Sequence, residues 1–351
     1  MRIRDDIRRD GLSMNFLLDE DMMSLLAQSF PNSLMNIGYP GICSKEKEIC
    51  KRIVTRLSSE PIETAVVGHA LKSHLDLMAE VTRDTNNSSA VFWIPFSDYF
   101  ISQTLKQEPD KILKDSANLI RYWRRISELP LDIALADTTA KQQGLDTRLF
   151  RFYDVLKEAG ARRLTVCDTR GIATPSSLKK LMRNIPPGTE KYWEFHPHND
   201  SGRALDNIAL MDSLGVSTIG TAVFGHGERG TMIDPRVLVK AYNLPFNATA
   251  FSDFYNSYCK LISGLEEPDQ LFSEGTIVTG SQHRLYQRKA KKLLFGVTSD
   301  RHILSQLSGI PQDQIPEGLL EAVKNRLYAE KERTYNSEKL IAKIREIQDG
   351  K

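Results

Sequence analysis

The sequence predicts an α/β fold, a (β/α)8 TIM barrel that is followed by a C-terminal helical region. Eight short strand-like runs alternate with longer amphipathic stretches over about 240 residues, close to the ~250 residues of a typical barrel. From residue 247 onward the pattern becomes mostly helical. The expected strands are residues 2–7, 33–37, 63–67, 90–95, 131–136, 163–167, 192–196 and 217–222.

Amphipathic helices are expected between these strands and after the last one. In residues 110–127, for example, Ile112, Leu119 and Trp123 recur at helical spacing. Gly160 is typical of a residue that ends a helix. We expect the barrel at 1–246 and a helical C-terminal region at 247–351. The expected helices are residues 19–29, 45–57, 110–127, 145–159, 203–214, 250–261, 300–307, 318–328 and 338–347.

Composition excludes several classes of function. The 47 Lys and Arg residues are balanced by 45 Asp and Glu residues, which does not favour nucleic-acid binding. The charged N-terminus is unlike a signal peptide, and no apolar run approaches the ~18 residues of a membrane span. Four scattered cysteines fit reduced thiols. We therefore expect a cytoplasmic protein that acts on small molecules, with no nucleic-acid or membrane partner.

Two histidines and one carboxylate form the first candidate site. His196 and His198 lie two residues apart on an expected strand, so their side chains point to the same side at the end where barrel active sites lie. Two such imidazoles can bind one divalent metal, and Asp10, after the first strand, can complete the ligand set. The alternatives are two buried, hydrogen-bonded histidines and an ordinary turn at Asp10-Gly11.

Two further segments carry polar residues at strand ends. Asp168 and Thr169 follow the sixth expected strand, where they can serve a site or cap the next helix. The glycine-rich segment 225–230 follows the eighth strand. Such a loop can let backbone amides approach an anion, but it is also compatible with an ordinary flexible loop.

Taken together, four segments resemble a known family. Residues 9–11, 168–175, 196–202 and 225–229 occur in the order and spacing of the metal-dependent pyruvate-carboxyltransferase-like barrels. That family includes 2-isopropylmalate synthase, homocitrate synthase and hydroxymethylglutaryl-CoA (HMG-CoA) lyase. Residues 194–200 most resemble the synthase branch. Segments 280–283 and 299–302 extend the resemblance more weakly into the helical region.

The resemblance implies a Claisen condensation of an acyl-CoA, acetyl-CoA in the family, with a 2-oxo acid that is polarised by Mg, Mn or Zn. It also implies a homodimer in which a neighbouring subunit's tail supplies a base. An HMG-CoA lyase-like carbon–carbon lyase or aldolase, and a diverged non-catalytic ligand-binding protein, are the alternatives. The implied roles are metal ligand for Asp10, His196 and His198, oxyanion stabiliser for Arg9, base for His283, catalytic residue for Glu228, and substrate contact for Asp137, Asp168, Thr169 and Asn199.

Several positions depart from the family pattern. Asn36 stands where a glutamate is usual after the second strand, and Met232 lies near the position of an asparagine ligand. Ala140, beside Thr138 and Thr139, stands where the homocitrate branch supplies an arginine for a distal carboxylate. A buried carboxylate needs a paired cation, so we expect an acceptor other than 2-oxoglutarate. The exception would be a relocated cation, for which Lys72, His74 and Arg170 are candidates.

Overall fold

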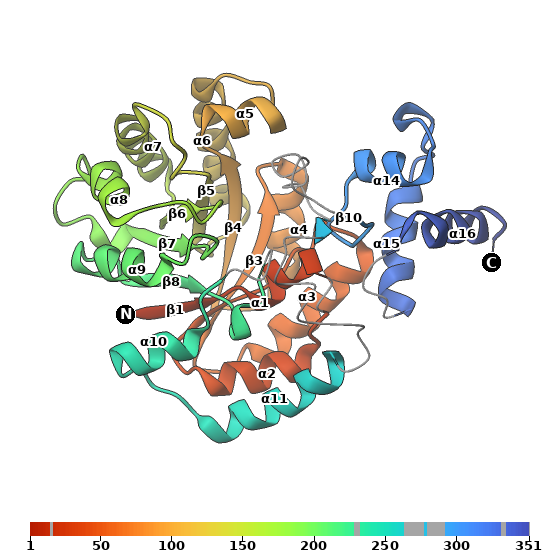
Figure 1. The fold of residues 1–351 in the computed structure, drawn as a ribbon, viewed down its shortest axis with the longest axis horizontal. Coiled ribbons are helices and arrows are strands. Elements are labelled where there is room, and N and C mark those ends of the chain that lie inside the picture. The colour runs from red at the N-terminus through yellow and green to blue at the C-terminus, as the bar shows by residue number, and fades with distance from the viewer. Residues whose placement is uncertain (15–16, 228–231, 263–276, 279–291, 331–334, 351) are drawn as a thin grey trace.

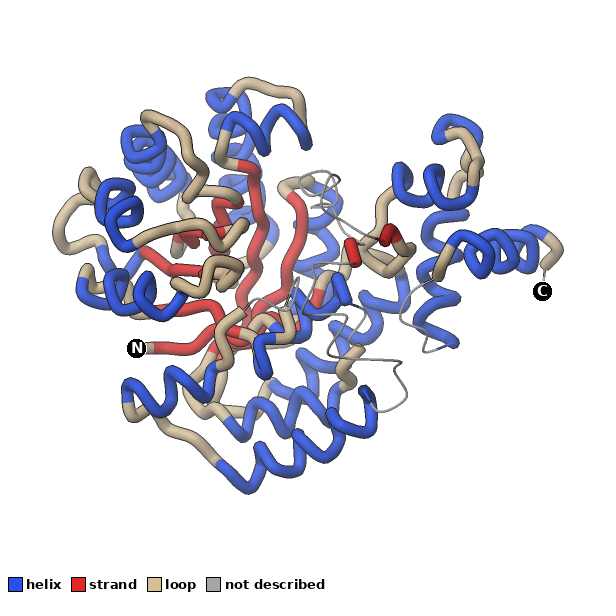
Figure 2. The backbone as a smooth tube through the Cα atoms, in the orientation of Figure 1, coloured by secondary structure: helices blue, strands red, loops and turns tan. Residues whose placement is uncertain are grey.

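Eight parallel strands form a closed barrel in sequence order in the computed structural model, which describes residues 1–14, 17–227, 232–262, 277–278, 292–330 and 335–350. Strand β8 pairs with β1 and closes the barrel. All eight expected strands are present, so the predicted TIM barrel is confirmed (Figure 2). The strands are β1 (Arg2–Asp5), β2 (Leu34–Gly38), β3 (Glu63–His69), β4 (Ser88–Pro95), β5 (Leu131–Ala136), β6 (Leu164–Asp168), β7 (Trp193–Pro197) and β8 (Thr218–Thr221).

Helices surround the barrel on its outside (Figure 1). In α6, the apolar face that the sequence predicts is the buried one, including Ile112, Ile120 and Trp123. The residue ranges expected from the sequence do not include α1, α4, α5, α8 or α10. The four-residue helix α1 (Ile7–Asp10) instead follows β1 at the barrel mouth. The helices of the outer layer are α2 (Glu20–Ser29), α3 (Ser44–Leu57), α4 (Lys72–Thr82), α5 (Asp98–Thr104), α6 (Pro109–Ile126), α7 (Leu145–Ala159), α8 (Pro175–Met182), α9 (Ala204–Ser213) and α10 (Pro235–Tyr242).

The next helix, α11 (Ala248–Ile262), belongs to the barrel rather than to the C-terminal region. It packs along α2, and its residues Phe254 and Tyr258 are buried in the same hydrophobic core as the barrel. The boundary expected between residues 246 and 247 is therefore not the boundary between the two hydrophobic cores. Aromatic side chains at helical spacing allow α11 to cover α2. The sequence pattern predicts this helix, but it does not predict that the helix packs on α2.

The second core is formed by α14 (Arg301–Ser308), α15 (Leu319–Glu330) and α16 (Ser337–Gln348), hereafter the tail. Phe295 and Val297 are buried in it together with Leu12 and Cys43 of the barrel. These helices lie on one side of the barrel, beside α3 (Figure 1). Within the chain, α15 contacts α3 of the barrel. The homodimer with crossed tails stays a prediction. Two short strands, β9 (Ile277–Val278) and β10 (Lys292–Leu293), pair in parallel.

A buried polar cluster fastens the tail to the barrel. Arg8 donates two hydrogen bonds to the carboxylate of Glu46 on α3, at 3.1 and 2.7 Å. The hydroxyl of Tyr328 on α15 donates to the same carboxylate at 2.5 Å. Arg8 and Glu46 are both fully buried, so this pair would be costly to break. The cluster fixes the position of α15 relative to the barrel mouth.

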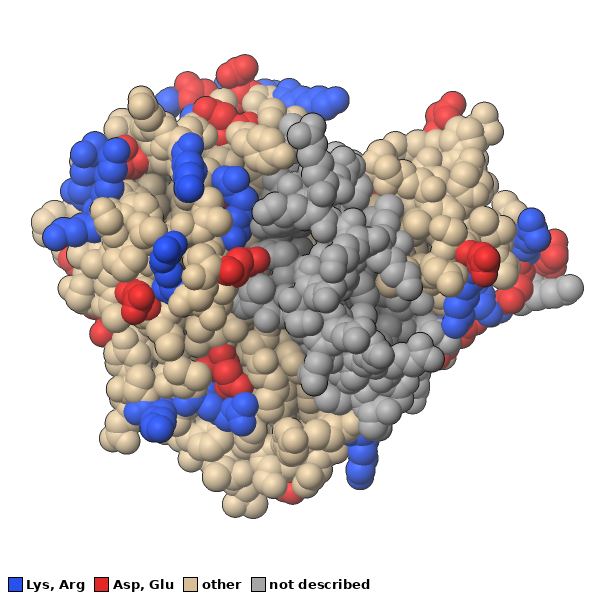
Figure 3. All heavy atoms as spheres, viewed as in Figure 1, with Lys and Arg blue, Asp and Glu red and all other residues tan. Residues whose placement is uncertain are grey.

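The surface agrees with the balanced composition. On the face that Figure 3 shows, basic and acidic side chains are interspersed over the barrel. None of the helices in the described ranges combines the length and the apolar character that a membrane span requires.

Candidate active site

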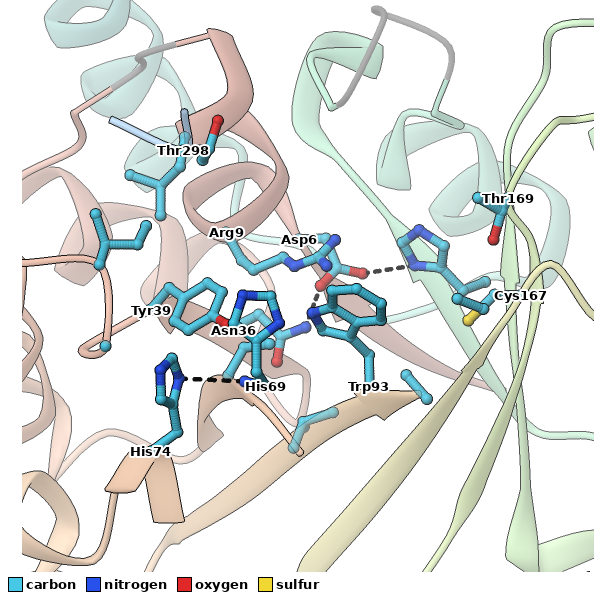
Figure 4. Close-up of a pocket in the computed structure, with 18 of the residues that line it drawn as sticks. Asp6, Arg9, Asn36, Tyr39, His69, His74, Trp93, Cys167, Thr169 and Thr298 are labelled. Atoms are coloured by element: carbon cyan, nitrogen blue, oxygen red, sulfur yellow. Dashed lines mark hydrogen bonds and ion pairs between the residues drawn. The ribbon is translucent and has the colours of Figure 1, made fainter. Parts of the chain in front are cut away.

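A cavity of about 450 Å³ opens at the C-terminal ends of the barrel strands. Its wall combines residues from these strand ends, such as His69, His196 and His198, with Ser299 and Lys324 from the segment and helices after residue 293. Figure 4 shows the cavity from inside, with an aromatic wall of Tyr39, His69, His74 and Trp93. The site is therefore built jointly by the barrel and its own tail.

The structure brings the expected metal ligands together. One ligand atom from each of Asp10, His196 and His198 lies within 4.8 Å of the other two. The two imidazole rings have centroids 5.1 Å apart. His196 lies in β7 and His198 directly after it, while Asp10 ends α1. Because β1 and β7 are both neighbours of β8, barrel closure brings Asp10 close to the two histidines.

These three residues fit a divalent metal. The Oδ2 atom of Asp10 is buried and, within the described part of the chain, accepts no hydrogen bond, although His196 Nε2 lies 3.5 Å away. A cation between them would satisfy this oxygen. One carboxylate and two imidazoles suit Zn, Mn and similar ions. Gly227 leaves the necessary room, because a Cβ there would lie 3.4 Å from Asp10 Oδ2 and 2.3 Å from Met232 Cγ.

The charges around this site favour a cation. Burial opposes ionisation of Asp10, but Arg9 and His196 hold its pKa well below the ordinary value. Burial likewise opposes charging of His196, but the carboxylates of Asp10 and Asp6 raise its pKa to about 10. Without a metal, a proton on His196 thus supplies the positive charge between two carboxylates. A metal ion would have to replace that proton.

A row of polar contacts behind His196 orients its ring. Asp6 Oδ2 lies 3.1 Å from His196 Nδ1, and Asn36 donates to the other oxygen of Asp6. Arg4 in turn donates to Asn36 Oδ1 at 3.0 Å. Gly220 permits this arrangement, because a Cβ there would lie 2.7 Å from His196 Nδ1. Such a carboxylate behind a histidine is a common support for a metal ligand.

The remaining expected site residues divide into three groups. Arg9 and Thr169 line the cavity, and Arg9 also contacts the carboxylate of Asp10. Three others have hydrogen-bond partners in the same or neighbouring loops and are not among the lining residues: Asp137, which accepts from Arg170 and Ser97; Asp168, which accepts from Thr139 and Ala173; and Asn199, which accepts from Ala204. Glu228 and His283 lie outside the described residues.

At the end of β5, Ala134 and Ala136 form the cavity wall, and neither Ala140 nor the neighbouring Thr138 and Thr139 is among the lining residues. The hydroxyl of Thr138 donates to the Cys167 carbonyl at 2.9 Å, so it points into the loop packing. The three cations considered as replacements for the family arginine also differ in place. Arg170 is paired with Asp137 at 2.8 Å, Lys72 lies 4.7 Å from the ring centre of Tyr122, and only His74 lines the cavity.

Sequence reasoning missed some cavity residues. Asp6 lies two residues after Arg4 at the end of β1, so strand alternation indicates that both side chains point into the barrel. His69 could have been found as a polar residue at the end of β3. Lys324 has no sequence signal, because a single lysine on an amphipathic helix is usually exposed.

Comparison with known proteins agrees with this geometry. The curated 2-isopropylmalate synthase of Dictyoglomus turgidum is 24% identical over 272 residues, covering 75% of this chain and 52% of that protein. This chain thus spans about half the length of that relative. The HMG-CoA lyase structure from Brucella melitensis covers 74% of this chain and 98% of its own, with a TM-score of 0.60 and 14% identity.

A second solved relative carries ligands. It is an HMG-CoA lyase from Acinetobacter baumannii in complex with coenzyme A and 3-methylmalate, with a TM-score of 0.58 and 15% identity. It covers 77% of this chain and 93% of its own. At these identities the solved structures support the barrel fold alone. Residues 22–243, well over half of the chain, match the HMGL-like family. The chain is therefore a member of the HMGL-like family.

Proposed function

We propose that this protein is a metal-dependent acyltransferase that condenses an acyl-CoA, acetyl-CoA in the first instance, with a 2-oxo acid in a Claisen reaction. The observation that carries the proposal is the grouping of Asp10, His196 and His198 within 4.8 Å, beside Arg9, in one cavity at the barrel mouth. Relatives named as synthases and lyases support an enzyme of carbon–carbon bond chemistry.

The residues divide the chemistry as follows. Asp10, His196 and His198 would hold a divalent ion, Mg, Mn or Zn, which as a Lewis acid polarises the keto group of the 2-oxo acid. Arg9 lines the same cavity and carries a permanent positive charge, so it stabilises negative charge that develops on the keto oxygen. Asp6 keeps the ring of His196 in one orientation through its contact with Nδ1.

The base that removes a proton from the acyl-CoA methyl group is proposed to be His283, and Glu228 is proposed as a second catalytic residue. Both assignments rest on the resemblance, as do substrate contacts by Asp137, Asp168, Thr169 and Asn199. Among these four, Thr169 has the best support because it lines the cavity. A homodimer and a cytoplasmic location are further parts of the proposal.

The test is a substrate panel. Purified protein with Mn²⁺, acetyl-CoA and a series of 2-oxo acids is assayed for thiol release, with Asp10→Asn and the exposed-site control Asp206→Asn in parallel. The proposal expects acceptor-dependent release of CoA that is lost in Asp10→Asn and kept in the control. Cleavage of hydroxy acids or their CoA esters without condensation would replace it with the lyase alternative. No turnover in either direction would favour a non-catalytic ligand-binding protein.

A further inference from the structure

A buried lysine of the tail lies in the wall of the active-site cavity. Lys324 on α15 is only 7% exposed and lines the cavity together with Ser299 and Leu320. Among the described residues no side chain is bonded to its ammonium group; the charges of Asp300 and Glu321 act on it from further away, and Asp300 also lines the cavity. Lysine is almost never buried without a partner, since the desolvated charge is costly. Such a residue in a cavity wall indicates a site for an anion.

The position of Lys324 is fixed by its own helix. Tyr328 lies one turn further along α15, on the same face, and its hydroxyl is bonded to the buried carboxylate of Glu46. Glu46 is in turn held by two hydrogen bonds from Arg8. This anchor holds the charge of Lys324 at the cavity instead of leaving it on a mobile surface chain.

The cavity has two ends. Figure 4 shows Thr298 and His74 on one side and Cys167 and Thr169 on the other. Cys167 pairs with His196 across β6 and β7, so its side is the metal-side end. Lys324 belongs to the opposite, tail-side end, because it lines the cavity together with Thr298 and Ser299 from the C-terminal part of the chain.

Between the two ends, the wall is aromatic. The ring of His69 lies edge-on to Tyr39 and Trp93, with centroids 5.1 and 5.0 Å apart, and Trp93 stacks on Phe100 at 6.0 Å. Burial lowers the pKa of His69 to about 3, with smaller contributions from His74 and Lys324, so His69 is uncharged at neutral pH. Arg9 stands at the metal-side end, and Lys324 stands at the tail-side end, where Asp300 also lines the cavity. The aromatic middle with a cation at each end fits a molecule that has an anionic group at both ends.

We infer that Lys324 binds an anionic substrate group at the tail-side end of the cavity, remote from the residues that would hold the metal. The inference rests on the proposed function, which places the keto acid group of the substrate at the metal-side end. The anion is a carboxylate or a phosphate, and it has two possible sources, a second carboxylate on the 2-oxo acid or a phosphate of the acyl-CoA. Burial lowers the pKa of Lys324 to about 8, which still leaves it mainly protonated at pH 7.

This inference changes the expectation that was based on Ala140. The sequence argument excluded a distal carboxylate because the family arginine after β5 is absent. Lys324 supplies a cation from α15, 184 positions after Ala140 in the sequence. It lines the same cavity as the barrel residues. A dicarboxylic acceptor therefore becomes compatible with this cavity.

Direct binding tests the inference without requiring turnover. The Mn²⁺-loaded full chain is titrated calorimetrically with 2-oxoadipate and 2-oxohexanoate, which differ only in the distal carboxylate, and with coenzyme A. Wild type, Lys324→Met, Lys324→Arg and the exposed-site control Lys51→Met are compared. A carboxylate at Lys324 predicts that the methionine variant binds the diacid about 10- to 100-fold more weakly and the monoacid unchanged, while the arginine variant retains most of the preference.

Each outcome decides the question. Weaker binding of coenzyme A alone in Lys324→Met assigns the anion to a phosphate of the acyl-CoA. Unchanged binding of all three probes, or no binding of any of them to the wild type, overturns the inference. Lys324→Gln gives the same comparison if the methionine variant does not fold. Failure of the proposed function is seen separately, as absence of CoA release in a protein that still distinguishes the two acids.

Discussion

Metal affinity is expected to depend steeply on pH because His196 must lose a proton before it can bind a cation. The carboxylates of Asp10 and Asp6 raise the pKa of His196 to about 10 in spite of its burial. At pH 7 the ring therefore holds its proton, which must be released before a metal ion can bind. Affinity therefore rises with pH, about tenfold per unit.

The measurement is the dissociation constant of Mn²⁺ between pH 6 and pH 9, obtained by calorimetry or by competition with a fluorescent chelator. An increase in affinity of about 1000-fold over this range is expected for the wild type. Asp6→Asn removes one of the two carboxylates that raise the pKa of His196, so this pKa should fall. The plot of Mn²⁺ affinity against pH should therefore reach its plateau at a lower pH than in the wild type. The control Asp206→Asn, which alters an exposed residue, follows the wild type.

Two results would refute this reasoning. An affinity that stays constant from pH 6 to 9 would mean that His196 is already neutral in the metal-free protein. A curve in Asp6→Asn that coincides with the wild type would mean that Asp6 does not influence the ring. Loss of affinity at all pH values in Asp6→Asn, with an unchanged slope, would leave Asp6 with a role in orienting the ring only.

Further predictions concern single residues and the assembly. Arg9→Ala should lower kcat by about 100-fold or more while the Mn²⁺ dissociation constant changes far less, and equal losses in both would contradict an oxyanion role. Tyr328→Phe removes the hydrogen bond to Glu46 and should lower the free energy of unfolding in urea by roughly 1.5–3 kcal/mol. His69 has a folded-state pKa of about 3, below the ordinary 6.5, so the folded state favours its neutral form. The stability that this residue contributes is present above pH 6.5 and is lost as the pH falls toward 3. Urea titrations should therefore give a lower free energy of unfolding at pH 5 than at pH 7. Light scattering at micromolar concentration should give the mass of a dimer, and a monomer would remove that part of the proposal.

The sequence by itself determined the barrel and the two histidines of the candidate metal site. Strand and helix periodicities are local, so eight strands could be placed within a few residues of their observed bounds. The spacing of His196 and His198 is also local, because residues two apart on a strand share a side. Asp10 was joined to them only through the resemblance, and the structure then brought its carboxylate within reach of both rings.

Only the tertiary structure decided what surrounds these residues. Asp6 reaches His196 across 190 positions of sequence, and Tyr328 reaches Glu46 across 282. The sequence predicts that Asp137 contacts the substrate, but its carboxylate is hydrogen-bonded to Arg170. Such pairings depend on barrel closure and on how the tail packs, and no periodicity records either. For the same reason a lysine on an ordinary amphipathic helix became a buried cation in the cavity wall once α15 docked beside α3.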